Sequence, residues 1–188
     1  MSCCRLSNVT KDYLARFYDI LDEMIRDMNC PGFTDSISYD FIAQMIPHHQ
    51  AAIEMCENCL RFTTNLCVQD ICQCIIEEQT ESIAAMRRIQ ERCSQCENCQ
   101  RDQCLYKRRV EQILPQMFDG MRCARVCNSV DCNFLRQMIP HHQGAVQMCR
   151  NCLQFDICPG LCPICQDIIS SQCRGIARME QLLRQLGC

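Results

Sequence analysis

Residues 41–62 read FIAQMIPHHQAAIEMCENCLRF, and residues 134–155 read FLRQMIPHHQGAVQMCRNCLQF. The two stretches share an identical MIPHHQ string and lie 93 positions apart. The same offset continues without a gap through the apolar residues on either side, so the chain is a tandem duplication. We assign a first repeat to residues 10–92, a Cys-rich connector to residues 93–104 and a second repeat to residues 105–186.

The two repeats agree most closely in their histidines and methionines. All four His fall into matched pairs, and so do ten of the eleven Met, although most aligned positions differ. Only four cysteines of each repeat have a partner in the other. Core packing is the usual role of Met on a helix and would explain the Met pairs, but it does not explain the His pairs. The pattern therefore indicates a common His, Met and Cys set with extra thiols added around it.

Each repeat contains three stretches in which apolar residues recur at helical spacing. In the first repeat they predict a helix that ends at Cys30-Pro-Gly, a second helix over about residues 37–62 and a third from about residue 68 into the nineties. Thr34-Asp-Ser offers caps for the second helix, and Pro47 inside it predicts a kink, as Pro140 does in the other repeat. The later equivalents lie over about residues 130–155 and 163–186.

No segment shows the apolar alternation of a strand, so we expect an all-α fold. The second and third helices of each repeat have long apolar faces that one repeat can hardly bury alone. The most economical arrangement combines these helices from two three-helix repeats into one four-helix bundle, with the first helix of each repeat packed outside.

Sulfur dominates the composition of the 188 residues, which include 22 Cys and 11 Met. The net charge of -3 leaves no basic excess to neutralise phosphates, so we expect no nucleic-acid partner. No run of eighteen apolar residues exists, so we expect no membrane partner. The first ten residues lack the apolar stretch of a secretory signal, which favours a cytoplasmic location, with a spore or released shell layer as the alternative.

Soft metal ligands lie on the inward faces of the predicted helices. At 100° per residue, Met45, His49 and Cys56 fall within about 40° of one another on the half-cylinder that carries the apolar residues. Thiolate, thioether and imidazole together suit Cu(I), with zinc as a second candidate. The candidate metal ligands are Met45, His48, His49, Met55, Cys56, Cys59, Cys72, Met86, Met138, His141, His142, Met148, Cys149, Cys152, Cys165 and Met179. Gln79 and Gln172 are candidates to orient an imidazole.

The string Met-x-x-His-His-x5-Met, followed by a helix with Gln-x6-Met, resembles the domain of unknown function 305 family. The matching residues are Met45, His48, His49, Met55, Gln79 and Met86, then Met138, His141, His142, Met148, Gln172 and Met179. The resemblance covers most of residues 37–90 and 130–183. It implies a ferritin-like helical fold and an association with copper binding and tolerance. The chain differs from the family in its Cys load, because the positions after Met55 and Met148, commonly Ala, are Cys.

Dense cysteine without an export signal favours a soft metal over a disulfide framework. Cys56 and Cys59 are three residues apart on one predicted helix, where a disulfide would constrain less than one turn but a metal would gain two ligands. We therefore expect a non-enzymatic protein that binds metal ions and stores or sequesters Cu(I) through Cys, Met and His.

The alternative is a structural or self-assembling protein of a spore or shell layer, held together by disulfides. Cysteines at the chain ends and in the connector could join copies of the chain into a homo-oligomer. The candidate cross-linking residues are Cys3, Cys4, Cys93, Cys96, Cys99, Cys104 and Cys188.

Overall fold

The computed structural model describes residues 6–188, so the cross-linking candidates Cys3 and Cys4 lie outside the described residues. Within that range the chain forms helices and no strand, which confirms the all-α class. The helices are α1 (Asn8–Asn29), α2 (Ile37–Leu60), α3 (Leu66–Cys93), α4 (Gln100–Arg122), α5 (Val130–Cys152) and α6 (Leu161–Leu186).

The starts of the two central helices follow the cap signals in the sequence. Ser36 caps α2 by accepting a hydrogen bond from the Tyr39 N–H, and Ser129 caps α5 in the same way at Cys132. Each bond satisfies one of the N–H groups that a helix start leaves without a partner. Both helices continue past their internal prolines, Pro47 and Pro140.

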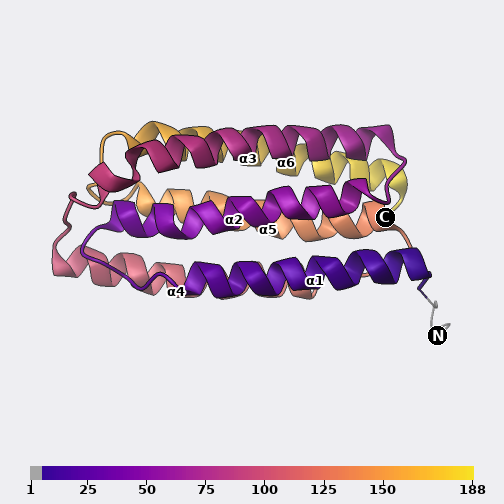
Figure 1. Cartoon of the computed structure of the whole chain (residues 1–188), viewed down its shortest axis with the longest axis horizontal. Coiled ribbons are helices and arrows are strands. Elements are labelled where there is room, and N and C mark those ends of the chain that lie inside the picture. Colours follow the sequence, from indigo (N-terminus) through magenta and orange to yellow (C-terminus); the bar gives the residue numbers. More distant parts are fainter. Residues whose placement is uncertain (1–5) are drawn as a thin grey trace.

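The six helices form three layers of two (Figure 1). α3 and α6 make one outer layer, α2 and α5 the middle layer, and α1 and α4 the other outer layer. α2 contacts α1, α3 and α5, and α5 contacts α2, α4 and α6, so the middle pair is covered on several sides. Fifteen of the 24 residues of α2 are therefore buried, against eight of the 28 residues of α3.

The connector, residues 93–104, is partly helical. It is non-helical only over residues 94–99, because Cys93 is the last residue of α3 and α4 begins at Gln100. The cross-linking role expected for Cys93 does not fit the structure, since the residue is fully buried. Cys93 continues the inward column of Cys72, Gln79 and Met86, which are seven residues apart and so lie on one face of the helix. Cys96 is half-buried, and Cys99 and Cys104 are exposed.

The C-terminal residue is bonded within the chain. Cys188 forms a disulfide with Cys132 in the first turn of α5. Gly187 precedes it with a φ of 67°, a left-handed conformation that ends α6 and that glycine adopts without strain. The expectation that Cys188 reaches a neighbouring molecule therefore differs from the structure. The other eighteen cysteines of residues 6–188 are free thiols.

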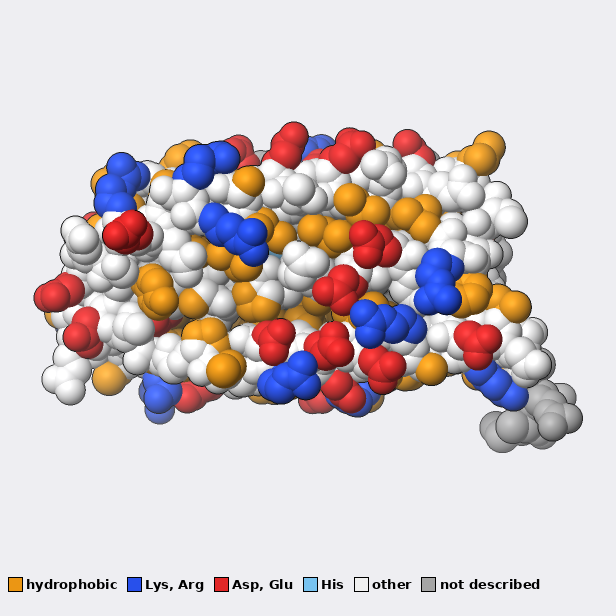
Figure 2. All heavy atoms as spheres, viewed as in Figure 1, with side chains coloured by type: hydrophobic (Ala, Val, Ile, Leu, Met, Phe, Trp, Pro, Cys, Tyr) orange, Lys and Arg blue, Asp and Glu red, His pale blue; other side chains and the backbone are white. Residues whose placement is uncertain are grey.

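Lys and Arg side chains are interspersed with Asp and Glu on the face shown in Figure 2. Among the described helices, none combines the length and apolar character needed to cross a membrane.

Candidate metal centre

The four histidines meet at the middle of the molecule, where α2 packs against α5. His48 and His141 stack with ring centroids 3.7 Å apart. The Nε2 of His48 lies 3.3 Å from the carbonyl oxygen of His141, and the Nε2 of His141 lies 3.2 Å from that of His48. His49 and His142 flank this pair, and the Nδ1 atoms of His48 and His49 are 3.4 Å apart. All four rings are at most 1% exposed.

Burial keeps these imidazoles neutral. It lowers the pKa of His49 to about 3 and that of His141 to about 4, and it lowers the pKa of His48 and His142 as well. A carbonyl oxygen can only accept a hydrogen bond, so the Nε2 of His48 and of His141 carries the proton. The Nδ1 of His141 then has a free lone pair and no partner in the described part of the chain. A neutral imidazole with a free lone pair is the form that binds a metal.

A buried group of three thiols lies at the end of each central helix. Cys56 and Cys59 of α2 face Cys72 of α3, and we call these three residues the first triad. Hydrogen bonds from Cys56 and then Cys59 lower the pKa of Cys72 to about 5, whereas burial and the Cys72 contact raise the pKa of both donors. In the first triad, Cys72 therefore accepts hydrogen bonds from two neighbouring thiols.

The second triad repeats this arrangement with Cys149 and Cys152 of α5 and Cys165 of α6. Hydrogen bonds from Cys149 and then Cys152 lower the pKa of Cys165 to about 5. All six triad cysteines are fully buried. The thiolate is the form of cysteine that binds a soft metal, and the lowered pKa of Cys72 and Cys165 favours that form in each half.

Each triad also has a tyrosine and an asparagine beside it, which the sequence reasoning missed. Burial and then the neighbouring Cys59 and Cys72 raise the pKa of Tyr13. Burial and then the neighbouring Cys152 of the second triad raise the pKa of Tyr106. Asn58 donates to the Tyr13 carbonyl at 3.0 Å, and Asn151 donates to that of Tyr106 at 3.3 Å. Both residue types recur at the offset of 93, so a search of the repeat for matched polar residues would have found them.

The predicted methionines and glutamines are buried as well. The Met candidates are between 0% and 1% exposed and belong to the same core, so either packing or thioether ligation accounts for their position. The side-chain nitrogen and oxygen of Gln79, and the side-chain oxygen of Gln172, have no hydrogen-bond partner in residues 6–188. The methionines are Met45, Met55, Met86, Met138, Met148 and Met179.

A cleft of about 580 Å³ between α3 and α6 leads toward the histidines. His49, Gln79 and Gln172 lie along its inner wall, and charged residues such as Glu81 and Arg88 lie along its outer part. Gln79 and Gln172 therefore line this cleft, although their unpartnered atoms are themselves shielded from solvent.

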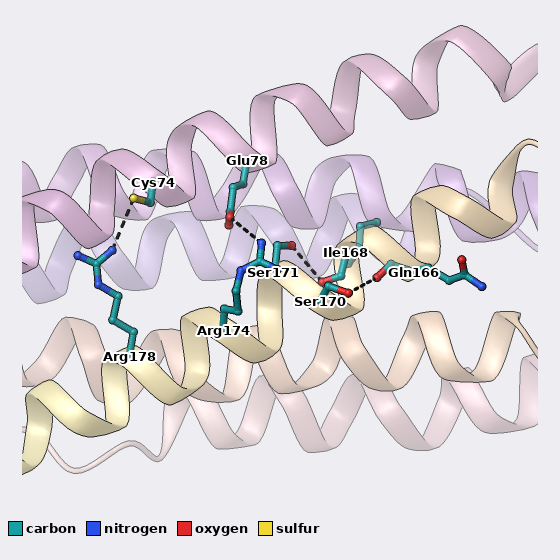
Figure 3. Close-up of polar contacts among 8 residues, drawn as sticks. All are labelled: Cys74, Glu78, Gln166, Ile168, Ser170, Ser171, Arg174 and Arg178. Carbon is teal, nitrogen blue, oxygen red and sulfur yellow. Dashed lines mark hydrogen bonds and ion pairs between the residues drawn. The ribbon is translucent and has the colours of Figure 1, made fainter.

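Polar contacts join the two helices beside this cleft (Figure 3). Arg174 of α6 pairs with Glu78 of α3 at 3.3 Å, and Arg178 donates to the Cys74 sulfur at 3.6 Å and pairs with Asp70. These side chains are largely exposed, so each pair contributes little stability, on the order of 0–1 kcal/mol. These contacts show that the cleft lies where the first and second halves of the molecule meet.

The donor set fits a soft metal, although no trio of His, Cys, Asp or Glu in residues 6–188 is already spaced around a common metal position. The sulfur atoms of each triad are instead joined by hydrogen bonds. A metal ion would replace the protons of those hydrogen bonds. Metal ligation by the triads and the histidines stays a prediction.

These features define a class of all-helical protein whose interior is lined by thiols, thioethers and imidazoles. The chain belongs to the family described as domain of unknown function (DUF305), whose model matches residues 38–183. No curated protein matches the chain.

Solved structures of similar proteins include CopM and a member of the family. CopM in the Ag-bound form, obtained by soaking, is 26% identical, with a TM-score of 0.60 over 81% of this chain and 98% of CopM. CopM in the Cu(II)-bound form is 27% identical, with a TM-score of 0.59 over 79% and 97%. A DUF305 fragment from Deinococcus radiodurans is 25% identical, with a TM-score of 0.59 over 82% and 99%.

Proposed function

We propose that this protein binds and sequesters Cu(I) in its interior, with the two triads as the principal sites and Met and His as further ligands. The observation that carries the proposal is the pair of repeat-related triads, each made of three fully buried cysteines from two adjacent helices. Cys56 and Cys149 also lie two helical turns from His49 and His142 on the same helices.

Electrostatics explains why a cation belongs at these positions. A buried thiolate without a counter-charge is costly, and the nearest hydrogen-bond donors to Cys72 and Cys165 are themselves thiols. Cu(I) would neutralise that charge and accept thiolate, thioether and imidazole ligands, all of which are soft. The similarity to CopM, solved with Cu(II) and with Ag, supports copper as the cargo.

The proposal includes a fold and a mode of action. In it, α2, α3, α5 and α6 act as a ferritin-like four-helix bundle of two three-helix repeats, supported by the contacts of α2 and of α6 with both α3 and α5. The protein holds its cargo without catalysis. It works in a compartment that keeps thiols reduced, for which the cytoplasm is the natural choice. Zinc is the competing cargo.

A Cu(I) titration of the reduced full chain against a competing chelator tests the proposal. At about two sulfurs per metal, 22 cysteines could hold on the order of ten ions. Tight uptake of only one or two ions would exclude storage by many thiolates. A parallel titration with Zn(II) shows which cargo binds more tightly.

A disulfide-cross-linked structural protein is the second candidate. The exposed thiols of Cys99 and Cys104, which nothing in the described residues covers, favour it. Mass mapping of disulfides in the non-reduced protein separates the two candidates. Bonds from these two residues to other chains would support cross-linking, whereas bonds from the triad cysteines would contradict the copper proposal.

A further inference from the structure

Three thiols outside the two triads gather where the halves of the chain join. Cys93 ends α3, Cys96 lies in the connector, and Cys158 lies in the loop between α5 and α6. Cys93 and Cys158 are fully buried or nearly so, and Cys96 is half-buried. We call these residues the junction cluster. Cys158 is 62 or more residues away from Cys93 and Cys96 in the sequence, so the sequence gives no sign that the three meet.

The backbone on either side of the junction cluster is fixed by hydrogen bonds to the start of α2. Ser36 donates to the carbonyl oxygen of Cys93 at 2.7 Å, and Ser38 accepts from the N–H of Cys158 at 2.9 Å. Asn98 bonds both to α2 and to the α5–α6 loop, at 3.0 and 2.6 Å. The three cysteines are therefore held by a rigid frame, which is what a binding site needs.

The sulfur of Cys158 lies among hydrogen-bond donors. Burial alone raises its pKa, but hydrogen bonds from Cys93, the Gly160 N–H, Cys96 and Arg92 lower it below the ordinary value. Gly160 also leaves room for Arg92, because a Cβ there would lie 2.5 Å from the guanidinium. Cys158 therefore has a cation and two thiols beside it.

This electrostatic setting distinguishes a metal site from a disulfide. Positive surroundings stabilise the thiolate, and stabilising the reduced form makes a disulfide easier to break. A Cu(I) ion bound by three thiolates carries a net charge of about -2, which Arg92 offsets in part. The surroundings therefore favour reduced sulfurs and a metal over a bond between two of the cysteines.

We propose that Cys93, Cys96 and Cys158 form a third soft-metal site, for Cu(I), which is separate from the triads and opens to solvent at Cys96. On binding, the metal replaces the thiol protons, which leave to solvent, and no electron is transferred. The site rests on the proposed function for its cargo but on none of the same residues. The first half has no equivalent, because the offset of 93 places Asn65 opposite Cys158 and Leu186 opposite Cys93.

The test is a Cu(I) titration of the reduced full chain against a competing chelator. We expect the variant C93S/C96S/C158S to lose one tight equivalent relative to the unaltered chain. The control variant C67S/C99S/C104S removes three exposed thiols outside every cluster and should lose none. Equal capacity of the junction variant and the unaltered chain would overturn the third site and leave the proposed function intact. An unaltered chain that binds no Cu(I) would overturn both.

Because Cys93 and Cys158 are buried, a second measurement uses the unaltered chain. We expect saturation with Cu(I) to slow alkylation of Cys96 by iodoacetamide at least about tenfold, with exposed Cys30 as the reference residue, followed by mass mapping. Equal alkylation of Cys96 with and without Cu(I) would overturn the site. A disulfide from Cys158 to Cys93 or Cys96 in the protein as isolated would overturn it as well.

Discussion

The two halves of the molecule share their candidate metal chemistry and differ in how they pack around it. Both have a stacked histidine at the centre, a triad of buried cysteines, and a Tyr and Asn pair beside that triad. In contrast, Ala51 of the first half is replaced by Gly144, and Ser82 is replaced by Gly175. The comparison shows that the two repeats keep the sulfur and imidazole set and differ in the small residues that pack around it.

The largest effect is expected from the central cysteine of each triad. Cys72→Ser should weaken Cu(I) binding in the first half, and Cys165→Ser should do the same in the second half. Loss of a residue that merely supports a ligand costs 10–100-fold in metal affinity, so we expect loss of the thiolate to cost at least about 100-fold. Competition titrations of the single and double variants measure this. Unequal losses would show that the halves are not equivalent.

Packing at Gly144 should produce the next largest effect. A Cβ on Gly144 would lie 2.1 Å from the sulfur of Met117, so Gly144→Ala requires a buried side chain to move. We expect a loss of about 1–3 kcal/mol in the free energy of unfolding, as for other overpacked cores. The reciprocal change, Ala51→Gly, should cost about 1 kcal/mol through helix propensity. Urea denaturation measures the loss of unfolding free energy in both variants. A larger loss in Ala51→Gly than in Gly144→Ala would contradict the packing difference.

Acid should destabilise both halves through their buried imidazoles. The pKa values of His49 and His141 are depressed to about 3 and about 4, while the unfolded chain binds a proton near pH 6.5. The unfolded state therefore holds more protons between about pH 4 and 6.5, and stability falls as pH falls in that window. The slope is about 1.4 kcal/mol per pH unit for each histidine. Cys72 and Cys165, whose pKa is lowered to about 5, also make the protein less stable as the pH falls toward 5.

Urea denaturation at pH 7, 6, 5 and 4 measures this dependence. A free energy of unfolding that stays flat from pH 7 to pH 4 would show that the histidines are not buried and neutral. The comparison of His49→Phe with His141→Phe indicates how much of the slope each half supplies.

The smallest effect is expected at Gly175, which packs against the second half's outer histidine. A Cβ there would lie 3.0 Å from Cδ2 and 3.1 Å from Nε2 of His142, so Gly175→Ala requires a shift of a few tenths of an ångström. The gain in helix propensity of about 1 kcal/mol offsets much of this cost. We expect a net change in stability below about 1 kcal/mol but weaker Cu(I) binding in the second half. Ser82→Gly in the first half is the matched control. If both variants changed Cu(I) binding equally, the close contact between residue 175 and His142 would not explain the effect.

The sequence predicted the helices and the buried face of the molecule well, because both depend on local periodicity. The local sequence predicts the Ser36 cap and the end of α1 after Asn29. The helical spacing of the candidate ligands predicts that they are buried. The same seven-residue spacing places Cys93 inside the core, which its assignment to the connector and to cross-linking overlooked.

Contacts between distant segments could not be predicted from one sequence. The disulfide of Cys132 with Cys188 joins a helix start to the chain end, and the junction cluster joins residues of both halves. Neither has a counterpart at the offset of 93, so the repeat gave no guide to them. The cleft between α3 and α6 is likewise a product of how two helices are placed, which depends on packing across the whole interior.

The most direct test of the central claim is copper K-edge X-ray absorption of the reduced full chain loaded with two equivalents of Cu(I). The account predicts a first coordination shell made mainly of sulfur, with the same spectrum at one and two equivalents because the two triads are alike. The variant C72S/C165S should show fewer sulfur neighbours per copper ion at the same loading. A shell made of nitrogen and oxygen, unchanged in this variant, would contradict the claim that the buried triads hold the metal.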